Sequence, residues 1–201
     1  MDVYMTKQTF EVRDHSPLET VSRVSQQTTK QPPRGEGGPS IQPQQNQIKY
    51  MPAGSGAAYW GPGELMTFLI TGKESGGALF LAEISVAPGG GTPPHIHHRE
   101  DESFHLLEGT LTIQVGSDTI TASAGDFAFL PRGIAHSFRN NGDGYAKALV
   151  MTTPAGLEGF FEEVFDPALD RTAAPPSGSK ELIGRALAAG PRFGLELLPP
   201  A

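Results

Sequence analysis

Three histidines and one glutamate are the residues of this 201-residue chain whose types and spacing could do metal chemistry. His95 and His97 stand two residues apart in GGGTPPHIHHREDESFHLLEG, and Glu102 follows His97 five residues later. Side chains two residues apart on a strand share a face, so an extended segment would present both imidazoles together. A tight turn after them could return Glu102 to the same place. A second stretch, GDFAFLPRGIAHSFRN, supplies His136 behind a turn that contains proline and glycine.

These four side chains predict a site for one divalent transition metal ion. Imidazole nitrogens and one carboxylate suit Fe, Mn, Ni, Co or Zn, and the donor set does not choose among these metals. Four protein ligands would leave room for water or a substrate on an octahedral ion. Glu102 could in addition act as a general base toward a substrate hydroxyl, because a carboxylate beside a metal can accept its proton.

The other titratable residues of the first stretch are expected to lie outside this site. His98 directly follows His97, so on a strand its side chain should project from the opposite face. His105 should likewise lie on the alternate face of the next strand. Glu100 and Asp101 are expected in a solvated turn, which leaves Glu102 as the functional member of the acidic run.

Short alternating runs of apolar residues predict the scaffold that must position the four side chains. Residues 66–72 and 78–86 predict a hairpin of two buried strands, and apolar and polar residues continue to alternate through 104–115. About nine or ten short strands with tight turns between them predict a closed barrel or jelly roll, which also removes exposed strand edges. The 25 glycines and 18 prolines of the chain agree with a turn-rich all-β protein.

Helices are expected only after the strands. Thr153 could cap a first helix, whose apolar residues from Leu157 to Phe165 recur at offsets of 0, 3, 4, 7 and 8 and must be buried. A second helix is expected over 180–189, with Ser179 as its N-cap and Gly190 just past its end.

Composition divides the chain into three parts. Residues 1–47 are rich in Gln, Pro, Gly and Ser and predict a flexible N-terminal extension, because they offer little apolar surface to offset the entropy of ordering. Residues 48–153 are expected to form the barrel, and residues 154–201 a C-terminal helical extension.

Charge and cysteine content narrow the possible partners. The net charge is −7, the pI is near 5.3 and the basic residues are scattered, so we expect neither nucleic acid nor a membrane surface as partner. No apolar run approaches the ~20 residues of a membrane helix, and the N-terminus lacks the apolar centre of a secretory signal. We therefore expect a soluble cytoplasmic protein. The absence of cysteine excludes disulfides, thiolate ligands and cysteine nucleophiles.

Large aromatic side chains are candidates for the wall of a substrate pocket, because aromatic faces stack well on flat apolar ligands. Alternation alone does not say which of them face a pocket, and most are expected in the core. The six candidates are Tyr59, Trp60, Phe104, Phe127, Phe129 and Phe138.

Together the two histidine-containing stretches resemble the paired motifs of the cupin superfamily. The first motif, G-X5-HXH-X4-E-X6-G, runs from Gly89 to Gly109, and the second, G-X5-PXG-X2-H-X3-N, runs from Gly125 to Asn140. The segment between them, 110–124, has the short length of microbial members. The resemblance implies an all-β double-stranded β-helix, the cupin or jelly-roll barrel, that holds a divalent metal. Its implied ligands are His95, His97, Glu102 and His136.

Within this superfamily the chain most resembles bacterial single-domain quercetin 2,3-dioxygenase-like cupins. The similarity rests on YWGPGE ahead of the barrel, PPHIHHREDESFHLLEG in the metal motif and TPAGLEGFFEEVF after it. It implies a metal-dependent dioxygenase that cleaves a flavonol-like or other enolisable aromatic substrate with O2, with Glu102 as catalytic base, in a homodimer. Two alternatives stay open: a metal-dependent isomerase or cyclase of sugar or polyketide metabolism, and a non-catalytic small-molecule binder.

Overall fold

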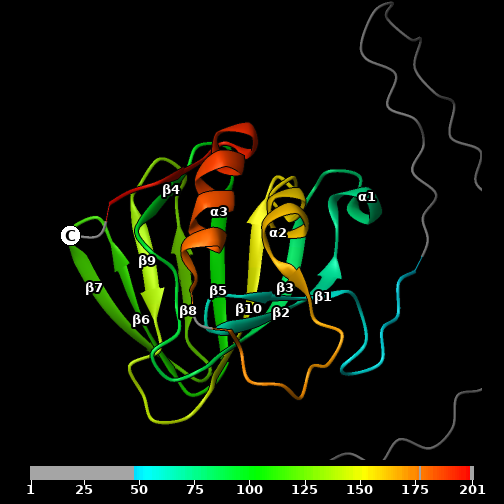
Figure 1. Cartoon of the computed structure of the whole chain (residues 1–201), viewed down its shortest axis with the longest axis horizontal. Coiled ribbons are helices and arrows are strands. Elements are labelled where there is room, and N and C mark those ends of the chain that lie inside the picture. Colours follow the sequence, from blue (N-terminus) through cyan, green and yellow to red (C-terminus); the bar gives the residue numbers. More distant parts are fainter. Residues whose placement is uncertain (1–47, 177, 200–201) are drawn as a thin grey trace, which may run out of the picture. The chain divides into compact units, whose positions relative to one another are not determined.

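Two antiparallel sheets face each other in the computed structural model, which describes residues 48–176 and 178–199 (Figure 1). The seven-stranded sheet has the order β11-β1-β2-β3-β10-β5-β8. Its strands are β1 (Ala58–Gly61), β2 (Glu64–Ile70), β3 (Phe80–Val86), β5 (Asp101–Glu108), β8 (Phe127–Leu130), β10 (Ala146–Thr153) and β11 (Asp166–Pro167). The five-stranded sheet has the order β12-β4-β9-β6-β7. Its strands are β4 (His95–His97), β6 (Thr110–Val115), β7 (Asp118–Ser123), β9 (His136–Arg139) and β12 (Leu195–Leu197).

Alternation of apolar and polar residues explains why these segments form strands with one buried face. In β3, Phe80, Ala82, Ile84 and Val86 are buried and the residues between them are partly exposed. The inward side chains of both sheets, with Phe104 among the largest, form one core. The all-β, jelly-roll fold with helices near the C-terminus, as expected from the sequence, is confirmed.

The first C-terminal helix, α2 (Glu158–Val164), begins later than the sequence predicted. Thr153 is not its cap, because this residue is the last of β10, where it pairs with Asp101. The chain then turns at Gly156 (φ 141°), whose N–H donates to the Glu158 carboxylate. The predicted apolar stripe is nevertheless directed inward, since Leu157, Phe160, Val164 and Phe165 are buried and Phe161 is packed against the core.

The last helix, α3 (Lys180–Phe193), begins as predicted and ends later. Ser179 caps it, since the Leu182 N–H donates to the Ser179 hydroxyl at 3.0 Å. The predicted end at Gly190 is wrong, because the left-handed residue that ends the helix is Gly194 (φ 73°), whose N–H bonds back to the last turn. A short helix, α1 (Gly72–Ser75), lies in the β2–β3 connection.

The C-terminal segment closes one side of the barrel and reaches the histidine-bearing strand. Helices α2 and α3 pack against each other (Figure 1), and β12 pairs with β4 so that Leu195 lies opposite His97. Residues 154–199 therefore contribute two short strands, β11 and β12, as well as helices. The predicted boundaries at 47/48 and 153/154 stay predictions, and the extension expected over 1–47 lies outside the described residues.

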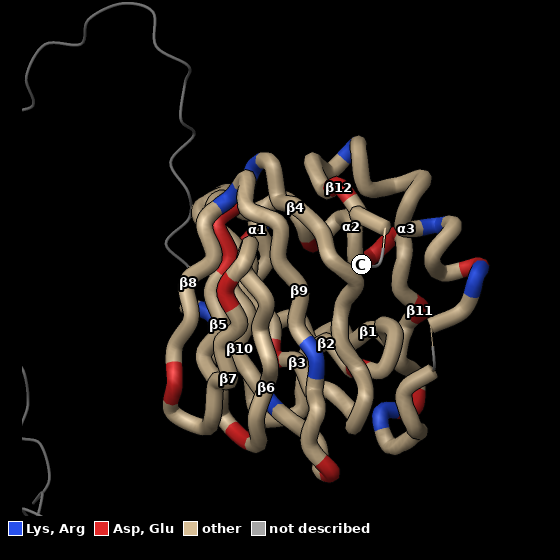
Figure 2. Tube along the Cα trace, turned by 90° about the vertical axis from the view of Figure 1, so that its left-hand side faces the viewer, with Lys and Arg blue, Asp and Glu red and all other residues tan. Residues whose placement is uncertain are grey.

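Charged residues are spread along the described chain. Figure 2 shows Lys and Arg distributed over several loops and strands, with no cluster on the side in view. Within residues 48–176 and 178–199, none of the helices combines the length and apolarity that a membrane crossing requires.

Candidate metal centre and its cavity

Two neighbouring strands of one sheet and one strand of the other bring the candidate ligands together. His95 and His97 project from the same face of β4, as their spacing predicted, and both are buried. His136, the first residue of β9, pairs directly opposite His95. The turn before His136 is tied to β4, because the Gly133 N–H donates to the His97 carbonyl at 2.7 Å. Glu102 reaches the same place from β5 of the other sheet.

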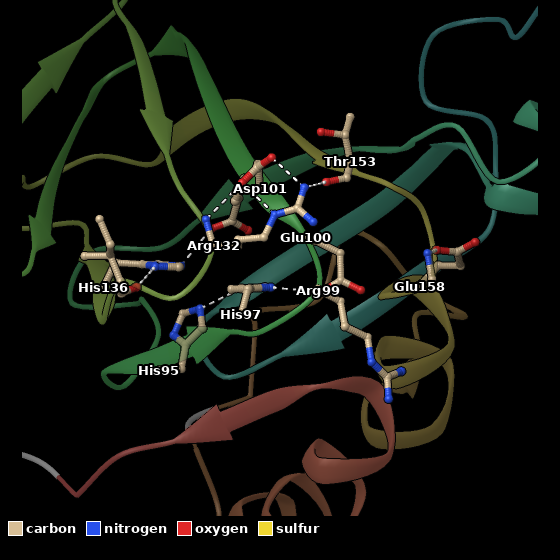
Figure 3. Close-up of polar contacts among 12 residues, drawn as sticks. His95, His97, Arg99, Glu100, Asp101, Arg132, His136, Thr153 and Glu158 are labelled. Carbon is tan, nitrogen blue, oxygen red and sulfur yellow. Dashed lines mark hydrogen bonds and ion pairs between the residues drawn. The ribbon is translucent and has the colours of Figure 1, made fainter.

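The four side chains converge closely enough to share one ion. Each offers one ligand atom, and these atoms all lie within 4.8 Å of one another. The Nε2 atoms of His95 and His97 are 3.1 Å apart, and His136 Nε2 is 3.1 Å from Glu102 Oε2. Figure 3 shows the three imidazoles directed toward a common point. The structure thus brings together all four residues that the sequence singled out.

Hydrogen bonds to backbone carbonyls orient two of the three imidazoles. His95 Nδ1 donates to the Pro93 carbonyl at 2.8 Å, and His136 Nδ1 donates to the Ile134 carbonyl at 3.0 Å. A carbonyl can only accept, so both rings carry the proton on Nδ1 and turn an unprotonated Nε2 toward the cluster. This tautomer can ligate a metal through Nε2, and the outer hydrogen bond from Nδ1 holds the ring in place.

The electrostatics of the cluster also fit a cation. Burial, reinforced by the charge of His136, lowers the pKa of His95 to about 4, so this imidazole is neutral near pH 7. Burial acts to raise the pKa of Glu102, but the imidazoles, His136 first, outweigh it and lower that pKa. Burial acts to lower the pKa of His136, and the Glu102 carboxylate outweighs it and raises the pKa.

Buried atoms without partners provide the test of whether an ion fits. Among the described residues, Glu102 Oε2 and His136 Nε2 have no hydrogen-bond partner, although both are shielded from solvent. Buried polar atoms almost always have a hydrogen-bond partner, so two such atoms without one, in a cluster of this composition, indicate that a ligand binds there. Three imidazole nitrogens and one carboxylate are compatible with a divalent transition metal ion.

Glu100 is where the sequence-based expectation for the acidic run was wrong. It is buried, at 3% exposed, and its Oε2 lies 3.9 Å from His97 Nδ1 (Figure 3). Its neighbour Asp101 is a partly exposed residue whose carboxylate takes two hydrogen bonds from the Arg132 side chain, which hold the pKa of Asp101 at about 2.

His98 and His105 are exposed and point away from the cluster, as predicted.

A cavity of about 930 Å³ opens onto the cluster, and His95, His97 and Glu102 form part of its lining. The rest of the wall is mostly apolar, and much of it comes from α2, α3 and the segment 87–93 between β3 and β4. This volume is within the range of small-molecule sites, which span ~300–1,000 Å³.

Of the six aromatic residues that were candidates for the pocket wall, only Phe138 lines this cavity. Phe127 and Phe129 are exposed on β8, with 63% and 56% of their surface accessible. Tyr59 packs against Phe68, with ring centroids 4.8 Å apart. The aromatic wall comes instead from the apolar stripe of α2, with the residues Phe160, Phe161 and Phe165.

Glu64 is a cavity residue that the sequence reasoning missed. It is the first residue of β2, is 2% exposed, and has an Oε2 without a hydrogen-bond partner among the described residues. Burial first, and then the charge of Glu102, raise the pKa of Glu64 to about 8. The strand period could have identified this residue, because Glu64 lies two residues before Met66 and shares the inward face of β2 with Met66 and Phe68.

Comparison with known proteins agrees with this geometry. Residues 82–152 match the Cupin domain family model. This match supports the cupin superfamily for this chain. It takes in β3 to β10 almost completely, and with them all four residues of the cluster.

Individual relatives cover parts of the chain. Germin-like protein 5-1 of Oryza sativa subsp. japonica is 43% identical in a 68-residue alignment that covers 31% of this chain and 31% of that protein. The tetracenomycin polyketide synthase protein TcmJ of Streptomyces glaucescens is 29% identical over 113 residues, 56% of this chain and 74% of TcmJ. The quercetin 2,3-dioxygenase of Bacillus subtilis (strain 168) is 25% identical over 130 residues, 65% and 38% of the two chains.

A solved structure, the polyketide cyclase RemF of Streptomyces resistomycificus, is 25% identical with a TM-score of 0.48, and the match covers 53% of this chain and 80% of RemF. The chain spans 31% of the germin-like protein and 38% of the quercetin dioxygenase.

Proposed function

We propose that this protein is a metal-dependent dioxygenase that acts on a flavonol-like or other enolisable aromatic compound. The observation that carries the proposal is the placement of a three-histidine, one-carboxylate cluster at the wall of an apolar cavity of about 930 Å³. A cavity of this kind accepts a flat aromatic ligand, and the cluster supplies the polar groups at which chemistry can occur.

His95, His97, Glu102 and His136 are the residues that would hold the ion, which we propose to be one divalent transition metal of the series Fe, Mn, Ni, Co or Zn. When bound, the ion would supply Lewis-acid charge for an enolate or phenolate oxygen and a place for O2 to react with the substrate.

Glu102 is the residue that we propose to move a proton. Its pKa is lowered by the surrounding imidazoles, so the carboxylate is ionised at neutral pH and can accept the proton of a substrate hydroxyl. His95 and His136 are held by the carbonyls of Pro93 and Ile134 and keep their Nε2 atoms facing that position.

The apolar walls have the complementary role of holding the ring and excluding water. Phe138, Phe160 and Phe161 line the cavity and can pack on a flat ligand. The similarity to a protein named quercetin 2,3-dioxygenase supports this substrate class.

One specific observation favours a second candidate. TcmJ, which is named a polyketide synthase protein, is matched over 74% of its length, more than the germin-like protein (31%) or the quercetin dioxygenase (38%). A metal-dependent cyclisation or isomerisation of a polyketide-like aromatic would use the same cluster and cavity without consuming O2. A non-catalytic binder of such compounds is the third candidate function, and the apolar cavity alone is sufficient for it.

An oxygen electrode separates these candidates. We expect the protein to consume O2 on addition of quercetin when it is loaded with at least one metal of the series, and we expect Glu102→Gln to abolish this uptake. Glu108→Gln, on the exposed end of the same strand, is the matched control and should retain full uptake. Metal content measured on each variant shows whether Glu102→Gln acts through proton transfer or through loss of the ion.

The other outcomes are equally distinct. Conversion of an aromatic substrate without O2 uptake would contradict the oxygenase and support the cyclase or isomerase. A rise in melting temperature on adding the compound, without any product, would instead support the binder.

A further inference from the structure

We propose that Glu64 is a substrate-binding residue whose carboxyl group hydrogen-bonds a hydroxyl of the aromatic ligand in the cavity. The proposal rests on the proposed function, because it takes the ligand class from it. It deepens that function by stating that the ligand must carry a second oxygen substituent, apart from the one that reaches the metal cluster.

The position of Glu64 is the first argument. It opens β2, and it lines the same cavity as Glu102 and the inward residue Met66. Its hairpin partner across β1 and β2 is Gly61, where a Cβ would lie 2.9 Å from Glu64 Oε1 and 2.6 Å from the Phe165 ring. The missing side chain at Gly61 therefore leaves the space that the carboxyl group occupies.

The unsatisfied state of the carboxyl group is the second argument. Glu64 is 2% exposed, and its Oε2 has no hydrogen-bond partner within residues 48–176 and 178–199. A buried polar group without a partner is costly, so a structure rarely keeps one unless something else binds it. A ligand in the adjoining cavity is the group in a position to do so.

The composition of the cavity wall is the third argument. None of the described residues that line it is Lys or Arg, so Glu64 has no cation there with which to pair. Burial and the Glu102 carboxylate both favour the neutral acid, which can donate one hydrogen bond and accept another. A hydroxyl group has the matching donor and acceptor, whereas an unsubstituted ring has neither. The polar lining residues are Glu64, Thr92, His95, His97 and Glu102.

A matched pair of ligands and variants tests this assignment. The affinities of quercetin and of unsubstituted flavone are measured by calorimetry for the wild type, Glu64→Gln and Glu64→Leu, all loaded with the same metal. Glu83→Gln is the control, because Glu83 lies on the adjacent strand β3 with its side chain on the opposite face from the buried residues. Thermal melts accompany every variant.

We expect Glu64→Leu to weaken quercetin binding by roughly tenfold or more, the effect of losing a buried hydrogen bond, and to leave flavone binding unchanged or tighter. Glu64→Gln, which keeps a donor and an acceptor, should remain within a few-fold of the wild type. Glu83→Gln should match the wild type for both ligands.

The failures are distinguishable. If the wild type binds quercetin and Glu64→Leu binds it equally well, the role of Glu64 is refuted and the proposed function stands. If Glu64→Leu weakens both ligands to the same degree, the residue shapes the cavity and does not recognise a hydroxyl. If the wild type binds neither compound, the proposed substrate class is refuted, and so is the role of Glu64 in binding its hydroxyl.

Discussion

At the scale of single residues, His97 differs from the other two histidines of the cluster in what faces its Nδ1. His95 and His136 donate from Nδ1 to backbone carbonyls, whereas His97 Nδ1 is buried, has no hydrogen-bond partner among the described residues, and lies 3.9 Å from Glu100 Oε2. That oxygen is buried and unpartnered as well. A small movement would join the two atoms and fix the ring of His97.

We therefore predict that Glu100→Gln, which keeps an acceptor oxygen but removes the negative charge beside His97 Nδ1, lowers the affinity for a divalent transition metal by about tenfold, the low end of the usual effect of losing the outer partner of a histidine ligand. Titration calorimetry of metal-free protein with one chosen ion measures this change. Glu108→Gln, an exposed residue of β5, serves as control and should bind as the wild type does. Equal affinities for Glu100→Gln and the wild type would show that Glu100 does not support His97.

Glu64 gives a pH-dependent prediction for the stability of the metal-free protein. Its pKa is near 4.5 in the unfolded chain and about 8 when folded, so between these values the folded state holds a proton that the unfolded state has released. Raising the pH through this window therefore lowers the free energy of unfolding. Glu64→Gln cannot titrate, so urea denaturation midpoints should fall less between pH 5 and pH 8 in this variant than in the wild type. Parallel pH profiles would contradict the assignment.

Residue-level prediction from the sequence succeeded where the determinant was local and failed where it was distant. His95 and His97 share a face because a strand has a period of two, which can be predicted from spacing alone. The burial of Glu100 could not be predicted in this way. Its Oε1 lies 3.8 Å from the position of a Cβ on Gly156, which belongs to a turn more than fifty residues later in the chain.

At the scale of elements, the segment between β3 and β4 is held against the strand that carries His136. Gly91 forms an isolated bridge with Arg139 of β9 and has a φ of 150°. A Cβ at this position would lie 2.1 Å from the Phe138 carbonyl oxygen, so the two backbones could not keep their spacing. Because Gly91 has no side chain, its backbone can lie close to that of β9, and the segment can form part of the cavity lining.

We predict that Gly91→Ala destabilises the fold by about 1–3 kcal/mol through overpacking, in addition to the cost of its backbone conformation. Gly125→Ala is the control: this residue also has a positive φ, 93°, but a Cβ there would meet nothing within 4 Å. It should lose only the ~1–2 kcal/mol of the backbone term. Chemical denaturation of both variants makes the comparison, and equal losses would mean that the contact with β9 is not tight.

The helices show which part of an element can be predicted from periodicity. The spacing from Leu157 to Phe165 correctly identified the buried face of α2, but not that part of this face borders a cavity instead of filling the core. The start of α2 was wrong because a local cap signal at Thr153 was overridden by the pairing of β10 with β5. Tertiary pairing of this kind leaves no trace in a short window of sequence.

At the scale of the whole molecule, the expected homodimer stays a prediction, and β8 is the strand where we expect a second copy. It is an edge strand of the seven-stranded sheet, and it carries the exposed rings of Phe127 and Phe129. Unpaired edges with exposed apolar side chains favour association. The expected cytoplasmic location also remains a prediction.

Sedimentation velocity at micromolar concentration tests this arrangement. The wild type should sediment as a dimer, and the double substitution Phe127→Ser with Phe129→Ser should sediment as a monomer with an unchanged circular dichroism spectrum. Leu169→Ser removes another exposed apolar side chain, away from β8, and should leave the dimer intact. A dimer that survives the double substitution would move the interface elsewhere.

The metal content of the purified chain tests the central claim most directly. Wild-type protein and His136→Asn are stripped with a chelator, loaded separately with Fe, Mn, Ni, Co and Zn, desalted, and analysed for metal per chain, with thermal melts to verify folding. We predict close to one ion per chain for the wild type with at least one of these metals, and far less for folded His136→Asn. A wild type that retains none of the five, or a variant that retains as much, would contradict the account.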